Sequence, residues 1–150
     1  MKKFFFRLER VLSLKRQLEK EASMRVREAE GWRQRALNEV DSKRRAQKEF
    51  SGLFFAHFEE GRFQVMGCES YRMYFERLAK DRAKAEETLM RITKMWEERR
   101  ESLIRATKAM KVLERLRESQ REMYEKGVMY KEQVAADDAV AGRKAKQDIA

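Results

Sequence analysis

The chain has 150 residues, of which 41% are charged and 42% are hydrophobic, and it contains no proline and only six glycines. A mixed globular domain of this length usually needs several prolines and glycines for its turns, so this composition favours long helices. The formal net charge of +10 also suits a disordered chain, but nine Phe, four Tyr, two Trp and nine Met need a surface to pack against, and this favours the helical interpretation.

The first predicted element is a helix over about residues 4–58. It opens with Lys2 and Lys3 followed by three phenylalanines, which imitates the start of a secretory signal. Arg7 ends this apolar run after three residues, far short of the roughly 7–15 that such a signal needs. No later stretch approaches the ~18 apolar residues of a membrane span, so the sequence predicts a soluble cytoplasmic protein.

Apolar residues in the first predicted helix follow a heptad pattern that later drifts by one position, from Leu8, Val11 and Leu18 to Leu12, Val26 and Val40. Such a drift fits an apolar face about a third of the helix wide rather than a strict seam. The reversal is predicted at about residues 60–68, where both periodicities lapse and Gly61 and Gly67 occur.

The second predicted helix covers about residues 70–130 and carries the clearest signal. Eleven of fifteen a and d positions from Phe75 to Tyr124 are apolar, which indicates a coiled-coil seam. Beyond Tyr130 the heptads are lost, and a frayed tail is expected over about residues 131–150.

Folding the chain about residue 64 pairs residues whose numbers add to about 128, so that Trp32 lies opposite Trp96 and Phe50 opposite Leu78. The predicted fold is therefore all-α, a single domain formed by a long antiparallel two-helix coiled-coil hairpin. The residues predicted to form its core are Leu8, Val11, Leu18, Ala22, Trp32, Leu89, Ile92, Trp96, Leu103, Met110 and Leu113.

Catalysis and metal binding find no support in the sequence. One cysteine, Cys68, and one histidine, His57, exclude an internal disulfide and a four-ligand zinc site, and they fit a reducing compartment. There is no glycine-rich phosphate loop, no GxSxG and no HExxH motif. Acidic residues are interleaved with Lys and Arg at helical spacing, which is explained by solvated ion pairs. No enzyme activity and no cofactor are expected.

The positive charge lies on the two predicted arms, whereas residues 51–69 sum to −2. A basic helical surface can attract nucleic acid, so a basic coiled-coil nucleic-acid-binding protein is one alternative, although no recognition motif accompanies the charge. A protein partner with an acidic surface explains the charge equally well. A prefoldin-like chaperone is disfavoured, because the residues of the predicted tip are too apolar.

Several short patterns, taken in order, resemble the FliJ family of flagellar export chaperones. The opening has Phe4, Phe6, Leu8, Glu9, Val11, Leu12 and Lys15 in the spacing of that family's first motif. Tyr71–x–x–Tyr74–x–x–x–Leu78 resembles the motif that opens its second helix. The run Trp96–Glu97–Glu98–Arg99–Arg100 and the later Leu113, Leu116, Glu118 and Tyr124 are also similar.

This resemblance implies a non-enzymatic stalk and adaptor of the flagellar type III export apparatus, peripheral on the inner face of the cell membrane at the flagellar base. Its expected partners are the export ATPase hexamer, the cytoplasmic domain of the export gate protein and the export chaperones. The equivalent stalk of a virulence type III secretion system is the nearest alternative. If the phenylalanines belong to the opening motif, Phe4 and Phe6 staple the first turn onto the second helix near Met123 and Tyr124.

Two surfaces are the candidate contacts. Near the reversal, Tyr71, Tyr74 and Leu78 share one helical face and are expected to meet the export gate. Close to the termini, a basic collar is expected to dock into the ATPase ring; its residues are Arg7, Arg10, Lys15, Arg117 and Arg121.

Overall fold

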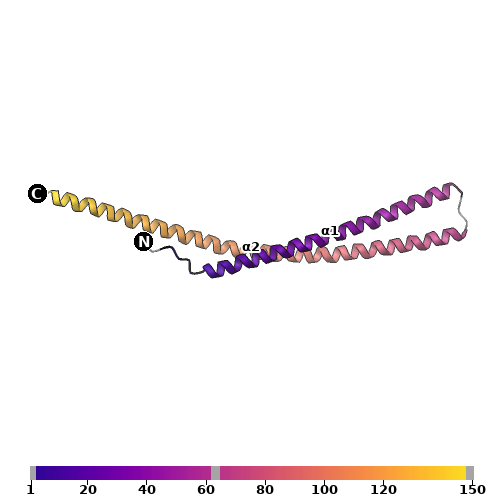
Figure 1. Cartoon of the computed structure of the whole chain (residues 1–150), viewed down its shortest axis with the longest axis horizontal. Helices are drawn as coiled ribbons and strands as arrows, with labels where there is room; N and C mark the ends of the chain where they lie inside the picture. Colours follow the sequence, from indigo (N-terminus) through magenta and orange to yellow (C-terminus); the bar gives the residue numbers. More distant parts are fainter. Residues whose placement is uncertain (1–2, 62–64, 148–150) are drawn as a thin grey trace. The chain divides into compact units, whose positions relative to one another are not determined.

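The computed structural model describes residues 3–61 and 65–147, and this part of the chain is formed by two helices without any strand (Figure 1). Helix α1 spans Glu9–Glu59 and helix α2 spans Val65–Gln147. Contacts between the two helices have the antiparallel sense of a hairpin, so the predicted fold class is confirmed.

The hairpin is divided into two compact units. Unit 1 consists of Met1–Glu19 and Arg105–Ala150, and unit 2 consists of Lys20–Ile104. Each unit therefore combines one stretch of α1 with one stretch of α2.

The register of the helix pairing agrees with a reversal near residue 64. In unit 1 the rings of Phe4 and Tyr124 are in contact, and these residue numbers add to 128. In unit 2 Arg82 donates a hydrogen bond to Gln47 and Arg44 pairs with Glu86, and these numbers add to 129 and 130. The predicted sum of about 128 is thus found in both units.

The reversal is shorter than predicted. Helix α1 ends at Glu59, and Gly61 follows with φ 67°, the left-handed conformation that glycine adopts after a helix end. The Gly61 amide donates to the Phe58 carbonyl at 3.2 Å and closes this last turn. Helix α2 begins at Val65, so Gly67, which the sequence suggested as part of the reversal, lies in helix; residues 62–64 are outside the described residues.

Helix α2 continues to Gln147, although the sequence suggested an end near residue 130. No proline stops it, the segment is rich in alanine, and Gly142 alone costs only about 1 kcal/mol relative to alanine. Lys144 and Lys146 lie in the last turn, where their positive charges interact favourably with the helix dipole. Every residue from 131 to 147 is exposed, so fraying of this segment in solution stays a prediction.

The seam of unit 2 is narrow and is built largely from small side chains. Its buried residues are Ala29, Ala36, Val40, Leu78 and Ala85. In the two units together, eight of the predicted core residues are half-buried: Ala22, Trp32, Leu89, Ile92, Trp96 and Leu103 in unit 2, and Met110 and Leu113 in unit 1. A pair of helices covers only one strip of each partner, so few side chains are completely enclosed.

The core prediction fails at the start of α1. Leu8, Val11 and Leu18 are 37%, 41% and 42% exposed, whereas the neighbouring Leu12 is completely buried. Successive helical residues are rotated by about 100°, so only one of two neighbours can face α2. At the start of α1 the residue that faces α2 is therefore one position later than the heptad predicts, and Leu12 is buried in unit 1 together with Phe6.

Candidate functional site

Aromatic side chains gather in unit 2 close to the reversal. The Phe50 ring lies 4.4 Å from the Tyr74 ring, 4.8 Å from the Phe75 ring and 5.2 Å from the Tyr71 ring, measured between centroids. Phe54 adds contacts to Tyr71 at 5.5 Å and to Phe75 at 5.7 Å. We call these five residues the aromatic cluster. It connects α1 to α2 where the seam would otherwise open.

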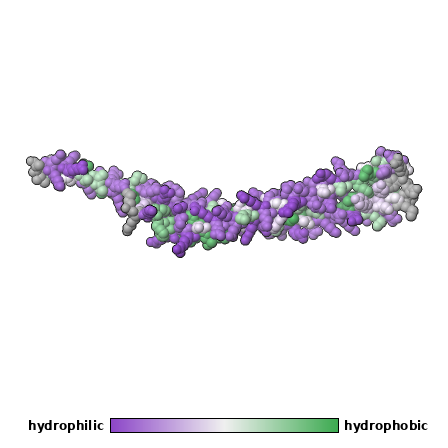
Figure 2. Space-filling model, viewed as in Figure 1, coloured by the Kyte–Doolittle hydropathy of each residue, from purple (hydrophilic) through white to green (hydrophobic). Residues whose placement is uncertain are grey.

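Part of this cluster is accessible to solvent. Tyr74 is 45% exposed, and Phe50, Ser70, Tyr71 and Tyr74 line an apolar groove of about 290 Å³. Other large apolar side chains of this region are also exposed: Leu53, Phe55, Phe58 and Met73. Hydrophobic residues accordingly appear on the surface at the loop end of the hairpin (Figure 2). An apolar surface of this kind is typical of contacts with other proteins.

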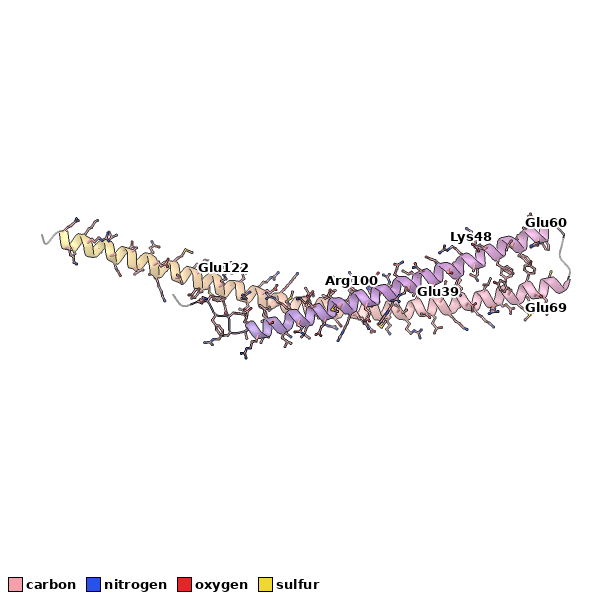
Figure 3. The ribbon with its side chains drawn as sticks, viewed as in Figure 1. Glu39, Lys48, Glu60, Glu69, Arg100 and Glu122 are labelled. Carbon is pink, nitrogen blue, oxygen red and sulfur yellow. The ribbon has the colours of Figure 1, made fainter. Side chains whose placement is uncertain are left out.

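The three residues expected to meet the export gate have different environments. Tyr74 is exposed, Tyr71 is half-buried against Phe50 and Phe54, and Leu78 is only 8% exposed. Leu78 therefore contributes to the core, and of the three only the tyrosines are available at the surface. Acidic residues border this region, since Glu60 follows α1 and Glu69 lies in the first turns of α2 (Figure 3).

The start of the chain is fastened onto α2 within unit 1. Residues 3–6 are not helical, the Phe4 ring lies 5.8 Å from that of Tyr124, and Phe6 is 4% exposed. The Glu9 amide donates to the Phe6 carbonyl at 3.2 Å. The predicted staple onto Tyr124 is confirmed by this ring contact, whereas Met123 is 64% exposed.

The five residues of the predicted basic collar fall into two groups. Arg117 is paired with Glu9 at 3.1 Å, and Arg121 with Glu125 at 2.9 Å. Arg7 and Arg10 are exposed and Lys15 is half-buried, and the structure shows no ion pair for these three. The charge available to a partner therefore comes from the first turns of the chain.

Two tryptophans form an interhelical layer in unit 2 together with two arginines. The Arg99 guanidinium lies 4.9 Å from the Trp32 ring centroid, and that of Arg33 lies 4.6 Å from Trp96. Arg99 also donates to the Glu28 carboxylate and to the Arg25 carbonyl, both at 3.0 Å. The heptad pattern predicts apolar pairing at this point. The signal for cation–π contacts is that each tryptophan has an arginine one or three positions after it: Arg33 follows Trp32, and Arg99 follows Trp96.

Glu86 links both helices further along unit 2. Its carboxylate accepts a hydrogen bond from Arg82 at 2.9 Å and one from Arg44 of α1 at 3.4 Å. The hydrogen bond from Arg82 is the main cause that lowers the pKa of Glu86 below its ordinary value of 4.5. Desolvation opposes it, and the charge of Arg82 and the hydrogen bond and charge of Arg44 add to the lowering. The carboxylate is therefore ionised at neutral pH, as this bridge requires.

No described helix has an apolar stretch long enough to cross a bilayer. Nor do three His, Cys, Asp or Glu side chains come together in residues 3–61 or 65–147 where a metal ion could be held.

Comparison with known protein families gives a match. The family described as "Flagellar FliJ protein" matches residues 4–148, nearly the whole chain. No curated protein and no solved structure matches it. The matched range includes the N-terminal segment that packs on α2, the tryptophan–arginine layer and the aromatic cluster. The chain therefore belongs to the FliJ family, and its role lies in flagellar protein export.

Proposed function

We propose that this protein is a non-enzymatic stalk and adaptor that binds both the export ATPase hexamer and the cytoplasmic domain of the export gate. The proposal also includes escort of export chaperones and a position at the inner face of the membrane at the flagellar base. Its main support is that the family match covers a chain with two chemically different surfaces, a basic one in unit 1 and an aromatic one in unit 2.

The ATPase contact is assigned to the first turns of the chain. Arg7 and Arg10 are exposed and take no part in the ion pairs of unit 1, so their charge is free to attract an acidic surface. Several exposed charges of one sign accelerate association most strongly at low ionic strength. Arg117 and Arg121 act indirectly in this proposal, because they hold Glu9 and Glu125.

A charge-reversed variant tests this contact. The double change Arg7→Glu and Arg10→Glu is expected to reduce stimulation of the export ATPase about tenfold at low salt, with a smaller difference at high salt because screening weakens the attraction. Steady-state ATP hydrolysis over a salt series measures it, with circular dichroism to verify unchanged helicity. Arg91→Glu with Lys94→Glu removes the same charge from exposed positions of unit 2 and serves as the matched control. Equal stimulation by both variants would contradict the assignment.

The gate contact is assigned to the groove beside Tyr74. Tyr71 and Tyr74 both contact Phe50, so replacing them by alanine would disturb the cluster as well as the surface. Ser70 lines the groove, is exposed and is not one of the rings of the cluster. A long side chain at this position obstructs the groove and leaves the aromatic contacts in place.

Ser70→Arg is therefore expected to weaken binding of the purified gate domain about tenfold, the loss typical of an obstructed apolar anchor, with an unchanged unfolding midpoint. Calorimetric titration gives the affinity and thermal circular dichroism gives the stability. Ser42→Arg, at another exposed serine of unit 2, is the control and should bind as the unmodified protein does. If Ser70→Arg retains full affinity, the gate binds elsewhere.

A further inference from the structure

Unit 1 carries large apolar side chains that lie outside the seam between its helices. On α1, Val11, Leu14 and Leu18 are 41%, 56% and 42% exposed, and on α2, Val112 and Leu116 are 65% and 40% exposed. We call these five residues the apolar strip. Single exposed apolar residues are ordinary, but a contiguous set indicates a contact surface.

The strip lies on one side of the hairpin. On α1, Val11 directly precedes the buried Leu12. On α2, Val112 directly precedes the half-buried Leu113. Leu116 directly precedes Arg117, which pairs with Glu9 of α1. Val11, Val112 and Leu116 are thus each rotated by about 100°, in the same sense, from a residue that faces the other helix. Leu14 and Leu18 follow Val11 by three and seven positions, so they lie on the same side of α1 as Val11. Antiparallel helices are related by a twofold axis perpendicular to their common plane, so equal rotations bring side chains to the same side.

Both helices contribute to the strip at the same height. Arg16 pairs with Glu114 at 3.2 Å, which places Leu14 and Leu18 beside Leu116 and Val112. Figure 2 shows hydrophobic residues gathered on the surface of unit 1, where the first turns of α1 lie along α2. Two helices with such a shared apolar side form two thirds of a three-helix bundle.

Basic residues border the strip on α2. Lys108 and Arg115 lie four residues before and three residues after Val112, so the three share one helical face. Both are exposed, and no ion pair of the described residues involves either of them. Two acidic residues of unit 1, Glu9 and Glu114, are already paired with arginines across the hairpin.

We infer that the apolar strip receives an acidic amphipathic helix of another protein, which packs its apolar face on Val11, Leu14, Leu18, Val112 and Leu116 and its carboxylates on Lys108 and Arg115. A second copy of this chain is a poorer occupant, because unit 1 holds 17 Lys and Arg against 10 Asp and Glu and repels itself. The inference goes beyond the proposed function, since it specifies the chemistry of a ligand and does not depend on the ATPase contact.

Three synthetic peptides of about 20 residues test it, a length that forms five to six helical turns. The first has leucines at i, i+3, i+4 and i+7 with glutamates at the other positions; the second has the same composition in scrambled order; the third has lysine in place of glutamate. Fluorescence anisotropy with the full chain is expected to show binding of the first peptide, at least about tenfold tighter than of either control, with affinity falling as salt is added.

Variants of the chain locate the binding. Val112→Asp is expected to weaken the acidic peptide about tenfold or more, because it removes an apolar contact and adds a like charge, and Lys108→Gln with Arg115→Gln is expected to reduce the salt dependence. Val140→Asp, at a 56% exposed valine of α2 outside the strip, is the matched control and should bind normally. Equal binding of all three peptides, or full binding by Val112→Asp, would overturn the inference. So would sedimentation showing a dimer that Val112→Asp dissociates, or binding to anionic lipid vesicles without binding to the acidic peptide.

Discussion

The Phe50→Ala variant is expected to unfold with a midpoint roughly 5–10 °C lower than that of the unmodified protein, a loss of about 3 kcal/mol. The Phe50 ring contacts Tyr71, Tyr74 and Phe75 within 5.2 Å, and each such aromatic pair is worth about 0.5–1.5 kcal/mol beyond its buried area. Thermal circular dichroism measures the midpoint, and hydrogen exchange should show lost protection at the end of α1 and the start of α2.

Phe55→Ala is the matched control for this experiment. Phe55 is on the same helix but 61% exposed, and its one ring contact given by the structure is with Phe54 of the same helix. Its removal should change the midpoint by less than about 2 °C, as is usual at the surface. Equal destabilisation by the two variants would show that the aromatic cluster is not what joins the helices near the reversal.

Leu12→Ala is expected to release the first turns of α1 from α2 in unit 1. Leu12 is completely buried, and removal of a buried leucine side chain costs about 2–5 kcal/mol. Because few other side chains are enclosed in this unit, that loss should appear as local opening, with strongly faster amide exchange over Glu9–Glu19. Exchange followed by mass spectrometry measures it.

Leu14→Ala is the control that distinguishes the loss of a buried side chain from a change in helix propensity. Leu14 is two residues away on the same helix and 56% exposed, so its replacement by alanine, a better helix former, should leave amide exchange in this segment almost unchanged. A stronger effect at Leu14 than at Leu12 would show that α1 faces α2 with a different side.

The fold was predictable because the chain contains no proline and its second half keeps a heptad pattern over many turns. Together these features leave few alternatives to a helical hairpin. Trp32 and Trp96, chosen only from spacing, do lie in the interface. The register at the start of α1 was not predictable in the same way, since Leu8, Val11, Leu12, Leu14 and Leu18 supply apolar residues on more than one side of the helix. The burial of Leu12 and the ion pair between Arg16 and Glu114 identify the side that faces α2.

Prediction of the candidate sites had a similar limit. Spacing placed Tyr71, Tyr74 and Leu78 on one face, but it could not tell that the seam encloses Leu78 and leaves Tyr74 half open. For the basic collar, the sequence shows which residues are charged but not which residues they pair with, so the ion pair between Arg117 and Glu9 could not be predicted. Ion pairs between helices depend on how the rotamers of long side chains meet, and a single sequence does not specify these.

The tryptophan–arginine layer has a consequence for sliding of the two helices. A seam of small residues such as Ala29, Ala36 and Ala85 offers similar packing after a shift of one heptad, so it opposes such a shift only weakly. A shift of seven residues would carry Arg99 about 10 Å from the Trp32 ring and from its Glu28 partner, and Arg33 equally far from Trp96. Within unit 2 the layer thus opposes sliding of α1 along α2, in addition to the aromatic cluster beside the reversal.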